Sequence, residues 1–323
     1  MKKHTVTITG AAGNIAYSLI FRILSGNIFK DESKIQIKLL DIPEAQEILK
    51  GVKYEIEDCA FERLDSIIIT SDYETAFGDS DFILLVGAKP RTKGMQRADL
   101  LLDNANIFKE QGKVIGQSCK KSSKVIVVGN PANTNALIIN KHTPNLPSEN
   151  ITSLMKLDQN RAKSIFSSKI KAPIEKIKKL IVWGNHSATQ YPDLSNVSVQ
   201  DSNDFSSLYD SSWISETFIP RVQNRGAEII EFRGKSSAAS AASAVYDHLK
   251  IIVNGSEDWE SMGIISNNPF NISSEVFFSY PLHITNDSIK IIDSVHVSEF
   301  SRNYLKQTET ELIKERDIIK DLL

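Results

Sequence analysis

Cysteine is scarce in this sequence, which contains only Cys59 and Cys119 among its 323 residues. The two are not spaced as metal ligands are. A chain of this length with two isolated cysteines fits a reducing compartment better than a disulfide framework. We therefore expect two packed or surface thiols, no metal site and a cytoplasmic location.

An excess of one charge and long apolar runs are also missing. The formal net charge is −2, and no block of lysine and arginine is long enough to attract nucleic acid phosphates. No apolar run approaches the roughly 18 residues of a membrane helix. The first strand-like run breaks at Gly10, before the apolar part of a signal peptide could form. We expect neither nucleic acid nor a membrane as a partner.

What the sequence does contain is an alternation of strand-like and helical segments in its first half. With 41% hydrophobic and 24% charged residues, the composition is that of a globular protein, and the length allows two domains. Expected strands cover residues 5–9, 35–40, 66–70, 82–86 and 125–128, and expected helices cover residues 14–24, 44–59 and 98–119. This rhythm is typical of an α/β fold with a Rossmann-type, doubly wound parallel sheet, which we assign to residues 1–153.

The rhythm changes after about residue 153. Expected helices at 158–168, 213–232 and 237–253 are followed by short strands near 262–266, 276–280 and 289–292 and by an amphipathic closing helix at 298–323. Residues 200–212 are rich in serine and aspartate and should form an exposed loop. We interpret residues 154–323 as an α+β domain that supplies substrate-binding and catalytic groups.

A glycine-rich turn joins the first strand to the first helix. In such a turn, backbone N–H groups and the positive end of the helix can face a pyrophosphate. The residues of the turn, all predicted to bind the cofactor, are Gly10, Ala11, Ala12, Gly13, Asn14, Ile15 and Ala16. Asp41 ends the second strand, where a carboxylate can bind the adenine ribose and repel a 2′-phosphate, which favours NAD over NADP. The plainer alternative is a tight turn with Asp41 capping the next helix.

Two short segments carry groups suited to oxidising an alcohol. His186 can take the hydroxyl proton, because an imidazole with a pKa of about 6.5 serves both reaction directions. Asp158 can fix the tautomer of that ring and stabilise its charged form. Arg161 follows Asp158 by three residues, so both lie on one side of a helix, and a guanidinium can hold a carboxylate at two points. Each group also has a structural alternative, such as a satisfied histidine or a surface ion pair.

A loop that leaves the fourth strand carries two further arginines, Arg91 and Arg97. Open α/β sheets bind their ligands at the carboxyl ends of the strands. A loop with Pro90 at its start and Gly94 in its middle can close over a substrate and exclude water. The alternative is that both arginines are simply solvated.

Five motifs in order give the chain a specific resemblance. They are Gly-Ala-Ala-Gly-Asn-Ile-Ala at 10–16, Pro-Arg at 90–91, Gly-Asn-Pro-Ala-Asn-Thr-Asn at 129–135, Leu-Asp-Gln-Asn-Arg at 157–161 and Trp-Gly-Asn-His-Ser at 183–187. With Gln-Tyr-Pro at 190–192 and Ser-Ser-Ala-Ala-Ser at 236–240, the match covers nearly the whole chain. The sequence resembles the malate dehydrogenases, and most of all the branch shared by many bacteria and the eukaryotic cytosol.

The resemblance implies a role for each matching position. His186 matches the catalytic base and Asp158 its carboxylate partner, while Arg161 matches the clamp on the carboxylate next to the hydroxyl carbon. Arg91 matches the contact to the distal carboxylate, and Arg97 the contact from the closed loop to the reacting oxygen. Asn130 corresponds to a residue that touches both substrate and cofactor. Residues matching those that line the nicotinamide half of the site are Asn104, Gln111, Val128 and Gly129.

Arg91 matters most for the expected substrate. Lactate dehydrogenases of the same superfamily have a neutral residue there, so a cation favours a dicarboxylate, because an unmet buried charge discriminates strongly. The resemblance thus implies NAD-dependent, reversible oxidation of malate to oxaloacetate, a reaction of the tricarboxylic acid cycle, by a homodimer. The alternatives are an NAD(P)-dependent dehydrogenase of another 2-hydroxy acid, and a catalytically silent NAD-binding scaffold.

Overall fold

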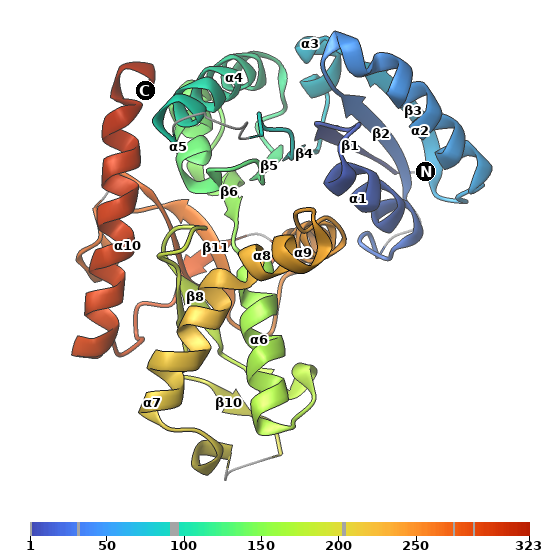
Figure 1. The fold of residues 1–323 in the computed structure, drawn as a ribbon. Coiled ribbons are helices and arrows are strands. Elements are labelled where there is room, and N and C mark those ends of the chain that lie inside the picture. Colours follow the sequence, from blue (N-terminus) through green and yellow to red (C-terminus); the bar gives the residue numbers. More distant parts are fainter. Residues whose placement is uncertain (1, 31–32, 91–96, 202–204, 274, 287) are drawn as a thin grey trace.

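A nine-stranded sheet runs through the protein (Figure 1) in a computed structural model that describes residues 2–30, 33–90, 97–201, 205–273, 275–286 and 288–323. The strand order is β13-β12-β11-β6-β5-β4-β1-β2-β3. Six strands pair in parallel: β1 (Lys3–Thr9), β2 (Lys34–Leu40), β3 (Leu64–Thr70), β4 (Phe82–Leu85), β5 (Lys124–Val127) and β6 (Ile151–Leu154). The expected doubly wound parallel sheet is therefore confirmed.

Helices cover both faces of the parallel part of the sheet, so side chains on both faces of β1 are buried from Thr5 to Thr9. In β1, Val6 and Ile8 are fully buried, and the hydroxyl of Thr7 on the other face donates to the carbonyl of Ala76 at 2.7 Å. The covering helices are α1 (Asn14–Ser25), α2 (Gln46–Asp58), α3 (Tyr73–Phe77), α4 (Arg97–Ser118) and α5 (Ala132–His142). The sequence analysis missed the short α3, the helix α5 and the strand β6.

The strands of the second half extend the first sheet. β11 (Glu260–Ile265) pairs antiparallel with β6, and β12 (Phe277–Ile284) and β13 (Ile289–Ile291) follow on its outer side. Gly263 of β11 lies so close to β6 that a Cβ there would be 1.9 Å from the hydroxyl oxygen of Ser153. The sequence analysis predicted these three strands, but as part of a separate second domain. It did not predict that β11 would pair with β6 of the first sheet.

The second half also supplies four longer helices: α6 (Lys156–Ile170), α8 (Ile219–Arg233), α9 (Ala239–Asn254) and α10 (Glu299–Ile318). Shorter elements complete it, namely β7 (Ile177–Lys178), β8 (Ile181–Trp183), β9 (Tyr191–Asp193), β10 (Ser198–Val199) and α7 (Ser211–Trp213). The single helix expected at 213–232 is in fact α7, a π-helical turn over Ile214–Phe218, and α8.

The described part of residues 200–212 is mostly exposed, as predicted, but two of its side chains pack inward. Phe205 and Tyr209 pack their rings against Phe166 of α6, with centroids 6.4 and 5.3 Å apart. Serines and aspartates gave the segment a polar composition, but the two aromatic side chains anchor it. Burying aromatic area is strongly favourable, so these contacts hold Phe205 and Tyr209 against α6.

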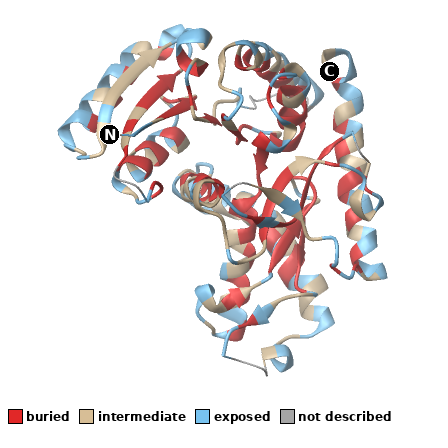
Figure 2. Ribbon diagram, turned by 180° about the vertical axis from the view of Figure 1, so that it is seen from behind, coloured by how far each residue is buried: buried red, intermediate tan, exposed pale blue. Residues whose placement is uncertain are grey.

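One apolar core joins the two halves of the chain. Helix α9 of the second half packs on α1 of the first, and Tyr246 of α9 accepts the backbone N–H of Asn27 at 3.2 Å. Buried residues follow the sheet and the inward sides of the helices (Figure 2). Cys59 is exposed and Cys119 partly buried, and both are free thiols as expected. Among the described residues, no helix is long and apolar enough to cross a membrane.

Candidate active site

The turn after β1 is built for close backbone approach. Gly10 has φ +62°, and a Cβ on it would lie 2.4 Å from the Cα of Gly87, which follows β4. The backbone N–H of Gly87 donates to the hydroxyl of Thr9 at 3.0 Å and ties the two strand ends together. Only glycine at position 10 allows this crossing, because other residues are strained at positive φ and would also clash.

The helix that follows this turn has an open N-terminus. Its N-cap residue is Gly13, which has no side chain to cap the helix, and the first turn carries no acidic residue. The N–H groups of Asn14, Ile15 and Ala16 therefore have no acceptor within the helix. With the positive end of the helix dipole, they form a site for an anion such as a pyrophosphate.

Asp41 holds the glycine-rich turn from the neighbouring strand. Its Oδ2 accepts the backbone N–H of Ala12 at 2.8 Å, and its Oδ1 accepts that of Ile42 at 2.8 Å. The carboxylate also lines the groove, so its free lone pairs can accept from a ribose hydroxyl. The side chain does not cap the next helix, whose N-cap residue is Ile42; it bonds to the glycine-rich turn and lines the groove, and its binding of a ribose stays a prediction.

The groove itself has a volume of about 770 Å³, within the range usual for cofactor sites. One wall consists of predicted residues, namely Gly10, Gly13, Asn14, Ile15, Ala16 and Asp41. The end of α8, the start of α9 and the connection between them supply further lining residues, which were missed: Arg233, Lys235, Ser236, Ala238 and Ala239. The Ser-Ser-Ala-Ala-Ser motif at 236–240 was the available signal, but it carried no assigned role.

A second cavity of about 310 Å³ contains the predicted reacting groups. Asp158 and Arg161 of α6 line it together with His186, Asn130 and Val128. Ile15 and Ser236 line both this cavity and the groove, so the two spaces adjoin. Lining residues that sequence reasoning did not assign are Leu154, Leu157, Ser187, Gln190, Gln223, Gly226, Ile230, Ser237 and Ala241.

Asp158 and His186 form a short hydrogen bond between Oδ2 and Nδ1. The Asp158 side chain is fully buried and that of His186 is 13% exposed. Burial by itself would raise the pKa of the Asp158 carboxyl, but the charge and hydrogen bond of His186, helped by Arg161 and Gln190, hold the pKa below its usual value. Asp158 is therefore ionised at neutral pH, and its Oδ2 accepts the hydrogen bond from Nδ1 of His186.

The loop that carries His186 is held by α5. Gly184 adopts φ +92° at the end of β8, and the backbone N–H of His186 donates to Oδ1 of Asn133 at 3.1 Å. Asn133 in turn donates to the carbonyl of Gly184 at 3.2 Å. Because Nδ1 is hydrogen-bonded to Asp158, Nε2 is the ring nitrogen that can exchange a proton with a substrate. Nε2 has no hydrogen bond to any of the described residues.

Arg161 is mostly buried, with 13% of its side chain exposed, and only part of its hydrogen-bonding capacity is used. Its Nη1 lies 3.4 Å from Oδ1 of Asp158, and its Nη2 donates to the hydroxyl of Ser237 at 3.2 Å. Its Nε is buried and has no hydrogen-bond partner among the described residues. A desolvated guanidinium with spare donors, placed in a cavity, is suited to binding a carboxylate.

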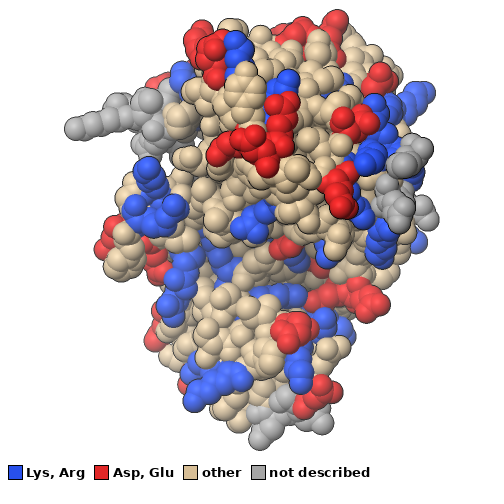
Figure 3. Space-filling view, turned by 90° about the vertical axis from the view of Figure 1, so that its right-hand side faces the viewer, with Lys and Arg blue, Asp and Glu red and all other residues tan. Residues whose placement is uncertain are grey.

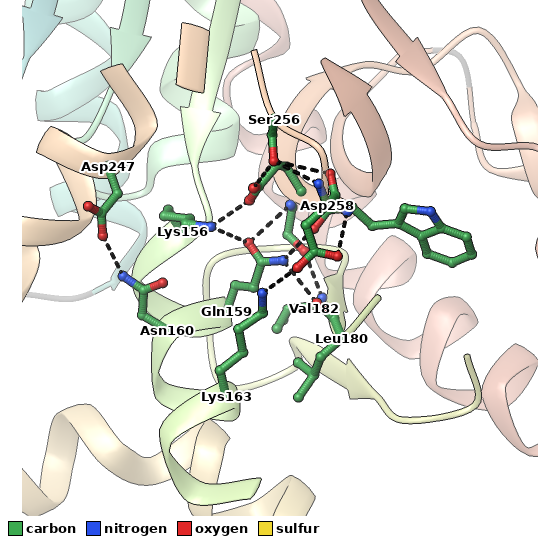
Figure 4. A network of polar contacts seen from close by, with 12 residues as sticks. Lys156, Gln159, Asn160, Lys163, Leu180, Val182, Asp247, Ser256 and Asp258 are labelled. Atoms are coloured by element: carbon green, nitrogen blue, oxygen red, sulfur yellow. Dashed lines mark hydrogen bonds and ion pairs between the residues drawn. The ribbon is translucent and has the colours of Figure 1, made fainter. Parts of the chain in front are cut away.

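The other side of α6 is fastened by a polar network (Figure 4). Lys156 forms a buried ion pair with Glu260 and donates to Oε1 of Gln159 at 3.1 Å. The amide of Gln159 donates to the carbonyls of Leu180 and Trp259, both at 2.9 Å. These contacts hold α6 against β8 and the start of β11, and so they hold Asp158 in place.

Some predicted residues are not brought to these cavities. Asn104 is fully buried, and its side chain is bonded to the backbone of Lys89. Gln111 is buried in α4, and neither residue lines the groove or the reacting-group cavity. Ala11 is buried behind the turn, and Gly129 donates its N–H to Leu85 at 2.9 Å. Arg91 and the side chain of Arg97 lie outside the described residues.

The chemistry open to this arrangement is proton transfer next to a dinucleotide-sized groove. A ring nitrogen backed by a buried carboxylate can accept and return a proton, and a guanidinium beside it can hold a small acid. Among the described residues, no group of three or more His, Cys, Asp or Glu could hold a metal ion. Acidic and basic side chains are interspersed over the face in Figure 3, without a field of one sign.

Comparison with known proteins agrees with this geometry. Residues 4–152 match the family model for the lactate/malate dehydrogenase NAD binding domain, and residues 155–322 match that for the alpha/beta C-terminal domain. A malate dehydrogenase from Naegleria fowleri is 40% identical, with a TM-score of 0.98 over 100% of this chain and 99% of that one. A Trichomonas vaginalis lactate dehydrogenase, solved with NADH and oxamate, is 36% identical, with a TM-score of 0.94 over 99% and 98% of the two chains.

Proposed function

Since the chain belongs to the lactate/malate dehydrogenase family, we propose that it is an NAD-dependent malate dehydrogenase that interconverts (S)-malate and oxaloacetate. In this proposal residues 1–153 bind the dinucleotide and residues 154–323 supply the substrate-binding and catalytic groups. Family membership supports an oxidoreductase that uses NAD(H). Family membership does not by itself select the substrate, because similar proteins include both malate and lactate dehydrogenases.

The fit of a dinucleotide rests on the chain's own groups. The open N-terminus of α1 offers unmet N–H donors to the pyrophosphate, and Asp41 offers acceptors to the ribose. When bound, the nicotinamide accepts or returns the hydride. Asn130 and Val128 are proposed to line the nicotinamide end, which is supported by their position at the cavity that adjoins the groove.

His186 is the proposed proton-transfer group. In the oxidation of malate, Nε2 accepts the hydroxyl proton as the C–H bond of the same carbon breaks and its electron pair leaves with the hydride. The products are oxaloacetate, the reduced cofactor and a protonated ring, which Asp158 stabilises through the Nδ1 hydrogen bond. In the reverse direction the same nitrogen returns the proton to the oxygen.

The arginines are proposed to hold the two ends of a four-carbon diacid. Arg161 binds the carboxylate next to the reacting carbon with donors that the protein leaves free. Arg91 binds the distal carboxylate, and Arg97 contacts the reacting oxygen from the loop at 90–97, on the strength of the sequence resemblance. Without a distal carboxylate, a cation at Arg91 would be left unpaired, and this disfavours a monocarboxylate.

The observation that carries the proposal is the buried Asp158–His186 pair, with Arg161 beside it, in a cavity that adjoins the groove. The test is initial-rate measurement of NADH oxidation with oxaloacetate, run beside pyruvate, and repeated with NADPH. We expect oxaloacetate and NADH to be strongly preferred. No turnover with any 2-oxo acid would instead support a silent NAD-binding scaffold.

Lactate dehydrogenase is the second candidate, favoured by the T. vaginalis protein at 36% identity. In that case pyruvate would be reduced at least as efficiently as oxaloacetate. The same assay separates the two functions, because the substrates differ only in the group that Arg91 is proposed to bind.

A homodimer is also proposed. The supporting observation is a set of exposed large apolar side chains on helices, which include Tyr54 and Ile48 of α2 and Phe232 of α8, the last 86% exposed. Sedimentation or light scattering would measure the mass of the particle. A monomer at micromolar concentration would contradict the proposal.

A further inference from the structure

Helix α10 contacts the loop that carries His186 through one carboxylate. Oε2 of Glu311 accepts the side-chain amide of Asn185 at 3.1 Å, the hydroxyl of Thr189 at 2.6 Å and the hydroxyl of Ser187. Asn185 precedes His186 in the chain, and Ser187 and Thr189 follow it. A single oxygen therefore holds the loop on both sides of the catalytic imidazole, from more than 120 residues away in sequence.

Thr308, one turn earlier on α10, holds the same loop through its hydroxyl. The backbone N–H of Asn185 donates to it at 2.8 Å, and the hydroxyl of Thr189 lies 3.0 Å away. The contact is close, because a Cβ on Gly184 would lie 2.3 Å from Cγ2 of Thr308. The side of the loop toward α10 therefore has little room to shift while these bonds are made.

The direction of the His186 ring depends on this loop. The ring makes one hydrogen bond, to Asp158 on α6, and its backbone N–H makes one, to Asn133 on α5. Among the described residues, α6 and α5 bond to the ring and the backbone of His186 and to the carbonyl of Gly184. They do not bond to the two side chains next to His186 in the chain, those of Asn185 and Ser187, whose described bonds go elsewhere. Those side chains are bonded to α10, so α10 completes the set of contacts that determines where Nε2 points.

We propose that Glu311 is a positioning residue for His186, which acts by holding Asn185, Ser187 and Thr189 and does not touch the substrate itself. The proposal rests on the proposed function of His186 in proton transfer. A charged acceptor forms hydrogen bonds about twice as strong as a neutral one, so a carboxylate suits a contact that collects three donors. If the loop relaxes, Nε2 moves relative to the substrate while the groove on the other half of the chain stays intact.

The test compares Glu311→Met with Glu311→Gln and with a matched control, Glu309→Met. Glu309 is 5% exposed on the same helix and also accepts a hydrogen bond, from the backbone N–H of Ser273 at 2.8 Å, but Ser273 belongs to another loop. For each variant, kcat and KM for oxaloacetate, the NADH Kd and the primary isotope effect with deuterated NADH are measured. The thermal midpoint of each reports on folding.

For Glu311→Met we expect kcat to fall about 10- to 100-fold, the scale on which displacement of a reacting group by about 1 Å acts. NADH affinity should change by less than about twofold, and the isotope effect on kcat should rise, because the chemical step becomes slower than product release. Glu311→Gln should recover most of kcat, since its amide oxygen still accepts hydrogen bonds. Glu309→Met should lose thermal stability but keep kcat.

Equal kcat in Glu311→Met and Glu309→Met, at similar thermal midpoints, would overturn the proposal and make Glu311 a structural residue of α10. If Glu311→Met does not fold, Thr189→Val tests the same contact from the other side. It should lower kcat in the same pattern, and unchanged kcat would contradict the proposal. Failure of the proposed function would give other results than failure of the role of Glu311. In that case the unchanged protein would not turn over 2-oxo acids, or His186→Asn would keep normal turnover.

Discussion

Two sides of helix α6 carry buried charges, and they differ in how completely those charges are satisfied. On the side toward β8 and β11, Lys156 pairs with Glu260 and Lys163 pairs with Asp258 (Figure 4). On the side toward the cavity, Asp158 pairs with His186 and Arg161. The side chains of Lys156 and Arg161 are similarly buried, at 9% and 13% exposed.

The side toward β11 is a closed network. The second carboxylate oxygen of Glu260 accepts the hydroxyl of Ser256 at 2.7 Å, and both amide donors of Gln159 reach carbonyls. Asp258 receives the backbone N–H groups of Lys179 and Trp259, each at 2.8 Å. These bonds and the ion pair with Lys163 hold the pKa of Asp258 below its usual value, although burial opposes them. A network of this kind positions a helix and leaves little capacity for a ligand.

The cavity side is open by comparison. Arg161 reaches Asp158 only at 3.4 Å, and its buried Nε has no partner among the described residues. A buried donor without a hydrogen-bond partner costs free energy. Such donors are therefore found mainly at functional sites, where a bound ligand supplies the missing acceptor. The comparison teaches that burial alone does not mark a functional charge. What separates the two sides is spare hydrogen-bonding capacity next to a cavity.

The strongest test of the open side is His186→Asn. Removal of a general acid–base group should lower kcat about 10²- to 10⁴-fold, because asparagine keeps a polar side chain but cannot take a proton. The free energy of unfolding and the NADH Kd should change little. Steady-state kinetics and fluorescence titration measure these quantities, and near-normal turnover would remove His186 from the proposed mechanism.

The closed side should respond in stability and much less in turnover. Lys156→Met leaves Glu260 buried without its cation, and we expect the free energy of unfolding to fall by about 3 to 5 kcal/mol. Adding Glu260→Met should restore most of that loss, since replacement of a whole buried pair is often neutral. Denaturant unfolding of the single and double variants checks this. A double variant as unstable as the single one would mean that the pair itself stabilises the fold.

Arg91→Gln tests whether the open side extends to the loop at 90–97. Loss of the cation should lower kcat/KM for oxaloacetate about 100-fold or more while pyruvate reduction falls less, so that the preference moves toward the monocarboxylate. Assays of both acids with the same enzyme preparation measure the ratio. An unchanged ratio would exclude Arg91 as the residue that selects a diacid, and Lys89→Gln is a suitable control on the same stretch.

The smallest expected effect is a change in how the free energy of unfolding depends on pH. It comes from His248, whose pKa is lowered by burial and in part by the charge of Lys156. Burial, and then the charge of Lys156, lower the pKa of His248 from 6.5 to about 3. The unfolded chain therefore binds a proton that the folded chain refuses between these values, so stability is intact above pH 6.5 and falls as the pH drops toward 3. At pH 5 the loss should be about 2 kcal/mol.

The measurement is denaturant unfolding at pH 7 and pH 5 for the unchanged protein and for His248→Gln. The variant should show a difference between the two pH values that is smaller by about 2 kcal/mol, because it has no proton to take up on unfolding. The exposed His283 on β12 is a matched control, and its replacement by glutamine should leave the difference as it was. An unchanged pH dependence in His248→Gln would show that other groups cause it.

Much of this architecture could be predicted, and the failures have a common cause. Strands and helices of the first half follow local patterns of apolar residues, so their positions were right to within a few residues. The strand β6 has polar Thr152 and Ser153 at the centre of its four residues, and the helix α5 is interrupted by Asn133 and Asn135, so neither shows a clear apolar pattern. The extension of the sheet by β11 depends on pairing with residues more than 100 positions away, for which no local pattern exists.

For the site, the sequence alone determined the kinds of chemical group and their motifs: the glycine-rich turn, the acid after the second strand, and the set Asp158, Arg161 and His186. Only the tertiary structure decided that Asp158 is fully buried against His186, that residues around the α8–α9 connection line the groove, and that Glu311 bonds to the loop that carries His186. The physical reason is that a short motif depends on the local backbone conformation, which neighbouring residues determine. Burial, cavities and hydrogen bonds between distant segments arise only when the two halves of the chain pack together.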